Sequence, residues 1–109
     1  MKQVVWKEAL KDFKSRLGKK YGDNLANLIL FGSTARGEWD DGSDIDVLVV
    51  LHDFEDFWQE FHTVTDIAYL VSMNTDFQVL ISPVLSKESE YKNAKDILLL
   101  NIKREGVTV

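Results

Sequence analysis

Two short apolar segments, Leu25 to Phe31 and Ile45 to Leu51, constrain the fold more than any other feature of this sequence. Both are rich in leucine and isoleucine or valine, which is typical of buried strands. Gly32-Ser33 ends the first segment, and only about a dozen residues connect the two, which is near the minimum for a crossover between parallel strands. We therefore expect a mixed sheet rather than an all-parallel one.

Helical and further strand patterns surround these two segments. The apolar spacing predicts an amphipathic helix over residues 3–19, a second helix entered through Asp53, and a last helix over residues 91–102 that ends before Gly106. Residues 77–84 resemble a third strand, with Pro83 near its end or on an edge. This order of elements indicates an α/β (α+β) fold, in which a mixed sheet of three to four strands is flanked by helices.

The length and composition are those of one small domain. The 109 residues, 45% of them hydrophobic, are enough for a single core, so we assign residues 1–109 to one domain. No signal-peptide pattern and no apolar run of membrane-spanning length occurs. The absence of cysteine agrees with a reducing compartment. We therefore expect a cytoplasmic protein without a membrane partner.

The net charge argues against nucleic acid as the main partner. Thirteen basic residues against eighteen acidic ones give a charge of −5, whereas proteins that hold bare duplexes usually present a basic surface. The nearest basic cluster, on the first helix, is better explained as a solvated helix face; it consists of Lys14, Arg16, Lys19 and Lys20.

Asp44 and Asp46 stand at the head of the second apolar segment. Residues i and i+2 of a strand point to the same face, so both carboxylates aim the same way. Two like charges at that distance repel unless a cation or a proton separates them. Mg²⁺ takes one or two carboxylates together with phosphate oxygens. Alone, however, an Asp-x-Asp sequence is weak evidence for a metal site, because it is also common in turns and at strand ends.

Gly32 and Ser33 follow the first apolar segment directly. A glycine there lets the backbone approach a ligand closely, and the following amides, at the start of a helical turn, can point at an anion. The Ser33 hydroxyl adds a further donor. Both features at one fixed gap occur by chance in about one chain per thousand of this length. Together they predict an anion cradle that faces a divalent-metal site, as a nucleoside triphosphate requires.

Gly32-Ser33, ten intervening residues and Asp44-Ile45-Asp46 resemble the signature of the DNA polymerase β-like nucleotidyltransferases. The short chain is similar to the minimal nucleotidyltransferase (MNT) group, densely over residues 25–51 and by element order elsewhere. The resemblance implies transfer of AMP from ATP to a hydroxyl group, with two Mg²⁺ ions. It also implies a toxin–antitoxin context, in which the partner is a helical HEPN-domain toxin and a tyrosine of that toxin can be the acceptor.

A third carboxylate on a later strand completes the metal site of such enzymes. Asp76 is the only carboxylate of the third predicted strand and stands at its start, and Gln78 follows on the same face. The alternative interpretation of Asp76 is a turn residue that precedes the strand. If the family position falls on Asp76, the site is complete, with Asp44, Asp46 and Asp76 as metal ligands. If it falls on Gln78, the protein can bind nucleotide but transfers slowly or not at all, because glutamine is neither an anionic ligand nor a base.

Other residues around the signature have two interpretations each. Arg36 can grip a phosphate with its guanidinium group or pair with neighbouring acidic residues. Trp39 can flank the nucleotide base or touch a partner, and Asp40 and Asp41 are best explained as solvated turn residues.

Two further functions compete with AMP transfer to a partner protein. One is a binding module that neutralises a toxin by contact and retains a vestigial nucleotide site. The other is modification of an aminoglycoside-like drug, which ordinarily requires a substrate domain that these residues do not provide.

Overall fold

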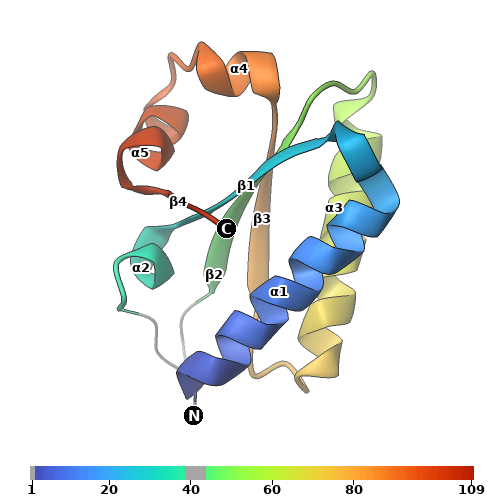
Figure 1. The fold of residues 1–109 in the computed structure, drawn as a ribbon, viewed down its shortest axis with the longest axis vertical. Coiled ribbons are helices and arrows are strands. Elements are labelled where there is room, and N and C mark those ends of the chain that lie inside the picture. The colour runs from blue at the N-terminus through green and yellow to red at the C-terminus, as the bar shows by residue number, and fades with distance from the viewer. Residues whose placement is uncertain (1, 39–43) are drawn as a thin grey trace.

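The structure, a computed structural model, describes residues 2–38 and 44–109, and only the backbone of residues 2–4. Trp39, Asp40 and Asp41 lie outside the described residues. The elements follow the order α1 (Lys2–Tyr21), a 3₁₀ turn (Gly22–Asn24), β1 (Leu25–Phe31), α2 (Gly32–Ala35), β2 (Ile45–Leu51), α3 (Phe57–Asn74), β3 (Ile81–Lys87), α4 (Glu88–Lys92), α5 (Ile97–Glu105) and β4 (Val107–Thr108) (Figure 1).

The four strands form one mixed sheet in the order β3-β2-β1-β4. β1 is antiparallel to both β2 and β4, whereas β2 and β3 are parallel. The predicted mixed sheet and the bounds of its two central strands are therefore confirmed. The register sets Phe31 of β1 and Ser82 of β3 on either side of Asp46 in β2.

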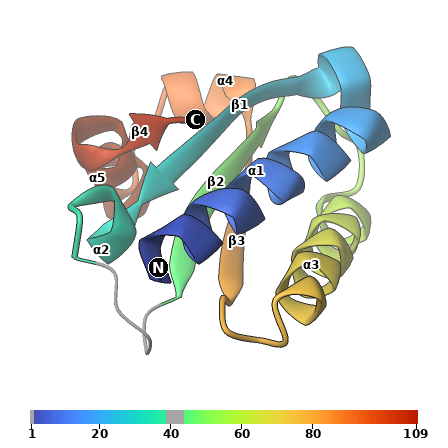
Figure 2. The same cartoon turned by 60° about the horizontal axis from the view of Figure 1, so that its bottom comes forward.

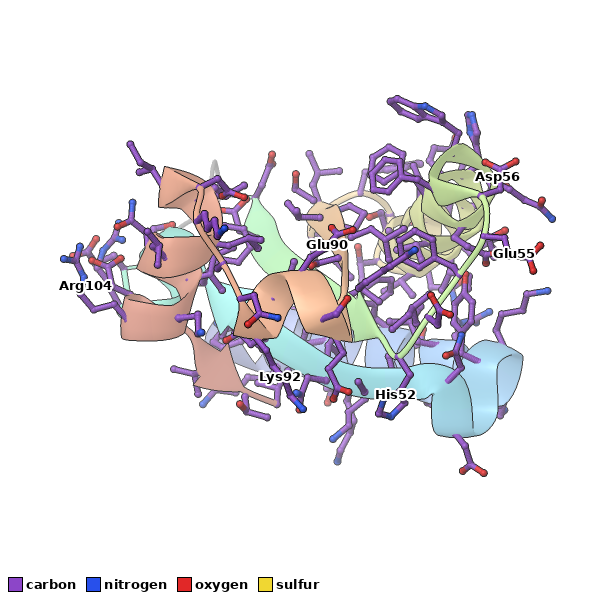
Figure 3. The ribbon with its side chains drawn as sticks, turned by 90° about the horizontal axis from the view of Figure 1, so that it is seen from above. His52, Glu55, Asp56, Glu90, Lys92 and Arg104 are labelled. Carbon is purple, nitrogen blue, oxygen red and sulfur yellow. The ribbon has the colours of Figure 1, made fainter. Side chains whose placement is uncertain are left out.

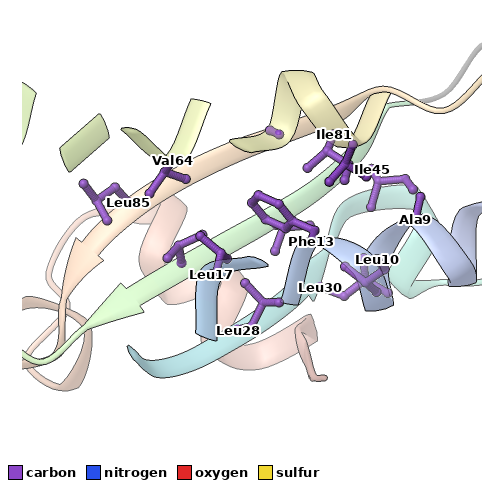
Figure 4. Packing of buried hydrophobic residues seen from close by; sticks show 14 of the residues in the cluster. Ala9, Leu10, Phe13, Leu17, Leu28, Leu30, Ile45, Val64, Ile81 and Leu85 are labelled. Carbon is purple, nitrogen blue, oxygen red and sulfur yellow. The ribbon is translucent and has the colours of Figure 1, made fainter. Parts of the chain in front are cut away.

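The sheet lies between α1 and α3 on one face and α5 on the other (Figure 2), and it separates two apolar clusters. Alternate residues of β1 and β2, such as Leu30 and Val47, pack against Phe13 and Leu17 of α1 and against α3 (Figure 4). The intervening residues pack on the opposite face, where Leu48 meets α5. The two-residue period of the strands thus assigns Asp46, which has the parity of Leu48, to the α5 face.

The third strand begins later than the sequence pattern indicates. Residues 77–84 resemble a strand, but β3 spans Ile81–Lys87. Asp76 and Phe77 instead have positive φ angles of 53° and 60°, in a turn in which the Thr75 hydroxyl accepts the Val79 amide. Pro83 lies inside β3 and is tolerated because β3 is an edge strand. The prediction that Asp76 begins the third strand is therefore wrong.

Three further predictions need correction, two of them on helices and one on the segment after Gly106. Asp56, not Asp53, caps α3 by accepting the Gln59 amide. The single predicted last helix is two helices, because Asp96 caps a new one by accepting the Leu99 amide at 2.8 Å. The tail after Gly106 forms β4, which was not predicted. None of the described helices is both long and apolar enough to cross a bilayer.

One hydrogen bond joins the two helices that cover the same face of the sheet. The Tyr21 hydroxyl of α1 donates to Glu60 of α3 at 2.9 Å. Burial and this bond raise the pKa of Tyr21 above its ordinary value of 10.0. The phenol form is therefore favoured in the folded protein, and the resulting stability is lost as the pH rises above about 10.

Tyr21→Phe is expected to lower the free energy of unfolding at neutral pH by about 1 kcal/mol, because it leaves Glu60 without its donor. The variant should also lose part of the fall in stability that the parent shows above pH 10. Urea unfolding at pH 7 and pH 10.5 measures both effects. Equal pH dependence in the two proteins would show that the phenol does not titrate with folding.

Candidate active site

Asp44 and Asp46 meet at the start of β2, on the face of the sheet that α5 partly covers. Asp44 is exposed, and Asp46 is partly buried. Burial is the larger cause of a raised pKa for Asp46, and the negative charge of Asp44 is the second. The two carboxylates therefore lie close enough to repel, and a cation bound between them would relieve that repulsion.

The backbone of Gly32 lies directly against the Asp46 carboxylate. β1 ends at Phe31, opposite Asp46, so the next residue passes directly under the Asp46 side chain. Gly32 has a φ of +75°, and a Cβ atom added to it would overlap the carboxylate oxygen of Asp46. Both the backbone angle and the contact exclude larger residues. Gly32 and Asp46, which are separate parts of the sequence signature, are thus in direct contact in the fold.

Ser33 is the second residue of α2 and follows this contact directly. The Ser33 carbonyl accepts the amides of Arg36 and Glu38, which closes the turn after the short helix. The first amides of a helix have no partner within it, so they can face an anion beside the Asp44/Asp46 pair. Thr34 is buried, and its hydroxyl oxygen has no hydrogen-bond partner in the described part of the chain.

Arg36 lies at the end of α2 and contacts two glutamates. Its Nε lies 3.2 Å from Glu38, and a terminal nitrogen lies 3.8 Å from Glu105 of α5. All three side chains are substantially exposed, so these pairs are weak. The pairing with Glu38 agrees with one of the two interpretations of Arg36. The contact with Glu105 comes from the far end of the sequence, and no local pattern could have revealed it.

The structure does not bring Asp76 and the Asp44/Asp46 pair into one metal cluster. Within residues 2–38 and 44–109, no three histidine or acidic side chains gather closely enough to hold a metal ion. Asp76 and Gln78 both lie in the exposed turn before β3. Two other residues lie beside the pair. Leu80, directly before β3, accepts the Ile45 amide through its carbonyl at 2.8 Å, and Ser82 of β3 is the register partner of Asp46.

The donor set therefore suits one divalent cation. Two carboxylates on one face supply hard oxygen ligands, and the remaining positions of an octahedral ion are commonly taken by waters and phosphate oxygens. The glycine beneath Asp46 lets the backbone at the start of α2 lie against that carboxylate. The described residues supply no third carboxylate for a second ion.

His52 follows the last residue of β2, at the end of the strand opposite Asp46, and Figure 3 shows it near α4. Its Nδ1 is 3.1 Å from Glu88, and Lys92 lies 3.7 Å from the same carboxylate oxygen. These residues link the end of β2 to α4. This pairing assigns His52 a local structural role, whereas the candidate catalytic aspartates lie at the other end of β2.

Comparisons with known proteins point to one family. A family model described as a nucleotidyltransferase domain matches residues 7–104. The chain is 34% identical over 102 residues to the "Putative protein adenylyltransferase MJ0141" of Methanocaldococcus jannaschii, covering 94% of this chain and 96% of the relative.

Two solved structures share the fold. One is a toxin–antitoxin crystal structure with AMP-PNP, with a TM-score of 0.58 and 22% identity, covering 88% of this chain and 68% of that chain. The other is a tri-AMPylated Shewanella oneidensis HEPN toxin in complex with an MNT antitoxin, with a TM-score of 0.51 and 20% identity, covering 99% and 71%. At these identities they inform on the fold alone, and they confirm the predicted fold class.

Proposed function

The chain belongs to the nucleotidyltransferase-domain family and is a nucleotidyltransferase, and we propose that it transfers AMP from magnesium-bound ATP to a hydroxyl group of a partner protein. The observation that carries this proposal is the contact of the Asp46 carboxylate with Gly32. Through this contact, the Asp46 carboxylate lies directly beside the start of α2, whose amides would face the phosphates in this proposal.

In this proposal Asp44 and Asp46 hold one Mg²⁺ ion, which when bound neutralises phosphate charge. Gly32 and Ser33 present backbone amides and a hydroxyl group to the terminal phosphates. The acceptor oxygen attacks the α-phosphorus, and pyrophosphate leaves. A second ion with Asp76 as a ligand stays a prediction, for which the position of Asp76 offers no support.

Exposed apolar residues next to the aspartates favour a protein acceptor. Leu80, directly before β3, is 47% exposed and is hydrogen-bonded through its carbonyl to Ile45, the residue between Asp44 and Asp46. Phe77, three residues earlier in the chain, is also exposed, and its ring centre lies 5.6 Å from that of the exposed Tyr69 on α3. Apolar patches of this kind commonly mark protein contacts. The name of the methanogen relative, a protein adenylyltransferase, points the same way.

Within residues 2–38 and 44–109, no third carboxylate joins the Asp44/Asp46 pair. This observation favours a second candidate function, which is inhibition of a partner by contact, with transfer slow or absent. A helical HEPN-type toxin is the partner that both candidates imply. A cytoplasmic location agrees with each of them. The two functions differ in whether the partner leaves with a covalent AMP.

Incubation with ATP labelled at the α- or the γ-phosphate, in the presence of Mg²⁺ and a co-expressed partner, tests the proposal. We expect α-label on the partner protein and no γ-label. Label from the γ-phosphate would indicate phosphoryl transfer and contradict the proposal. Stable association with the partner without either label would support inhibition by contact.

Arg36→Ala is expected to raise the KM for ATP about tenfold, because a guanidinium–phosphate contact contributes about 1.5–3 kcal/mol. The free energy of unfolding should change by less than about 0.5 kcal/mol, since the ion pairs of Arg36 are exposed. Arg104→Ala is the matched control, because Arg104 also contacts Glu105 but lies on α5. Equal KM values for the two variants would assign Arg36 to the ion pairs alone.

A further inference from the structure

A groove of about 390 Å³ lies between the N-terminal half of α1 and strand β4. Its floor is apolar and consists of Trp6 and Leu10 of α1, Leu30 of β1, and Val107 and Val109. Leu30 belongs to the cluster on the α1 face of the sheet, whereas Asp46 lies on the α5 face. This α1–β4 groove is therefore separate from the candidate active site.

Three lysines of α1 line the same groove. Lys7, Lys11 and Lys14 are spaced four and three residues apart, so they share one face of the helix, and all three are exposed. Within residues 5–38 and 44–109, no carboxylate forms an ion pair with them. The groove is thus a local basic site on a chain whose net charge is −5.

β4 presents an open edge beside this groove. It is the outer strand of the sheet and pairs with β1 on its inner side. The Val109 amide donates to Leu28, so in an antiparallel ladder the backbone groups of Thr108 point away from β1. No described residue hydrogen-bonds to them. Val107 and Val109, one residue to either side, face the groove.

We propose that the α1–β4 groove binds an extended acidic segment of a partner protein, which adds to the open edge of β4 as a further strand. Backbone groups of the segment pair with Thr108, apolar side chains cover Val107 and Val109, and acidic side chains on the same face reach the lysines. Strand addition of this kind combines main-chain hydrogen bonds with side-chain pockets.

The charge of the α1–β4 groove and the residues of its floor favour an acidic segment over two other occupants. A second copy of this chain that paired through β4 about a two-fold axis would bring two identical lysine rows together, and like charges repel. A nucleic acid would find lysines for its phosphates, but the floor is mainly aliphatic rather than a row of stacking aromatic rings.

Titration of the ¹⁵N-labelled protein with the peptide acetyl-Glu-Thr-Val-Thr-Val-Thr-Glu-amide tests the proposal. This peptide places two valines and two glutamates on one face. We expect shifts of the Thr108 amide and the Trp6 indole resonance, with a Kd below about 1 mM. The same peptide with lysine in place of glutamate should bind at least about tenfold more weakly.

Two pairs of variants separate the charge from the strand edge. Lys11→Glu/Lys14→Glu should raise the Kd about tenfold, whereas Lys19→Glu/Lys20→Glu, with the same change of charge further along α1, should leave it within about twofold. Thr108→Pro removes the outward amide and should abolish binding, whereas Thr108→Ala should not. Circular dichroism checks that the variants fold.

Four results would overturn the proposal. They are equal affinity for the acidic and the basic peptide, equal loss in the two lysine pairs, the same shifts on raising the protein concentration alone, and tighter binding of an oligothymidylate at the same resonances.

Discussion

Asp46→Asn is expected to lower the rate of AMP transfer about 10³-fold and to stabilise the metal-free protein. The rate falls because the cation site loses one of its two anionic ligands, and stabilisation of transition-state charge by a metal amounts to several kcal/mol. Stability rises because burial and Asp44 make the ionised Asp46 unfavourable in the fold. Solvent screening of this partly buried group keeps the gain below about 1 kcal/mol.

The pH dependence of thermal unfolding tests the sign of the stability change in Asp46→Asn. Because the pKa of Asp46 is raised above its ordinary value of 3.8, the folded state binds more protons than the unfolded state just above that pH. Its contribution to stability is therefore lost as the pH rises through the raised value. Metal-free parent and variant should differ least near pH 3 and most at neutral pH, as thermal unfolding would show.

Asp66→Asn is the control for loss of one negative charge, because Asp66 is exposed on α3, away from the site. It should change neither the transfer rate nor the pH profile. If Asp46→Asn left transfer intact, or destabilised the metal-free protein at neutral pH, the role given to the carboxylate pair would be wrong.

Gly32→Ala is expected to lower the transfer rate about 100-fold and the free energy of unfolding by at least about 1–2 kcal/mol. An alanine at a φ of +75° is strained, and its Cβ would displace the Asp46 carboxylate. A misplacement of about 1 Å at a reacting centre commonly costs a factor of about 100. Initial rates and urea unfolding of the same preparation measure both losses.

Gly37→Ala separates these two causes. Gly37 has a nearly identical φ of +76°, but a Cβ atom there would meet nothing within 4 Å. This control should therefore show the loss of stability that comes from backbone strain, without the loss of transfer. A similar loss of transfer in both variants would mean that the contact between Gly32 and Asp46 does not position the carboxylate.

Local patterns were sufficient for the part of the fold that carries the site. The bounds of β1 and β2 follow from their apolar composition. Gly32 was singled out because a glycine lets the backbone approach a ligand closely, whereas its contact with Asp46 emerged only from the structure. The family comparison confirms the resemblance that these residues suggested. The roles of Asp44, Asp46, Gly32, Ser33 and Arg36 stay predictions that the variants above can test.

The later elements depended on tertiary contacts or on weak local signals. Phe77 and Val79 alternate as in a strand, but a turn with two positive φ angles precedes β3. Asp76 was a local signal of that turn, because aspartate tolerates this backbone angle better than most residues. Asp96 was a visible capping signal for a separate α5. β4 is too short to be predicted and exists because β1 offers it an edge.

Nuclear magnetic resonance titration with ATP, with and without Mg²⁺, tests the central claim most directly. We predict that Mg²⁺-ATP shifts the amides of Gly32, Ser33 and Asp46, that ATP without Mg²⁺ binds at least about tenfold more weakly, and that Asp46→Asn removes this difference. Shifts confined to other parts of the protein, or equal affinity with and without Mg²⁺, would contradict the assignment of the Asp44/Asp46 pair as the metal-nucleotide site.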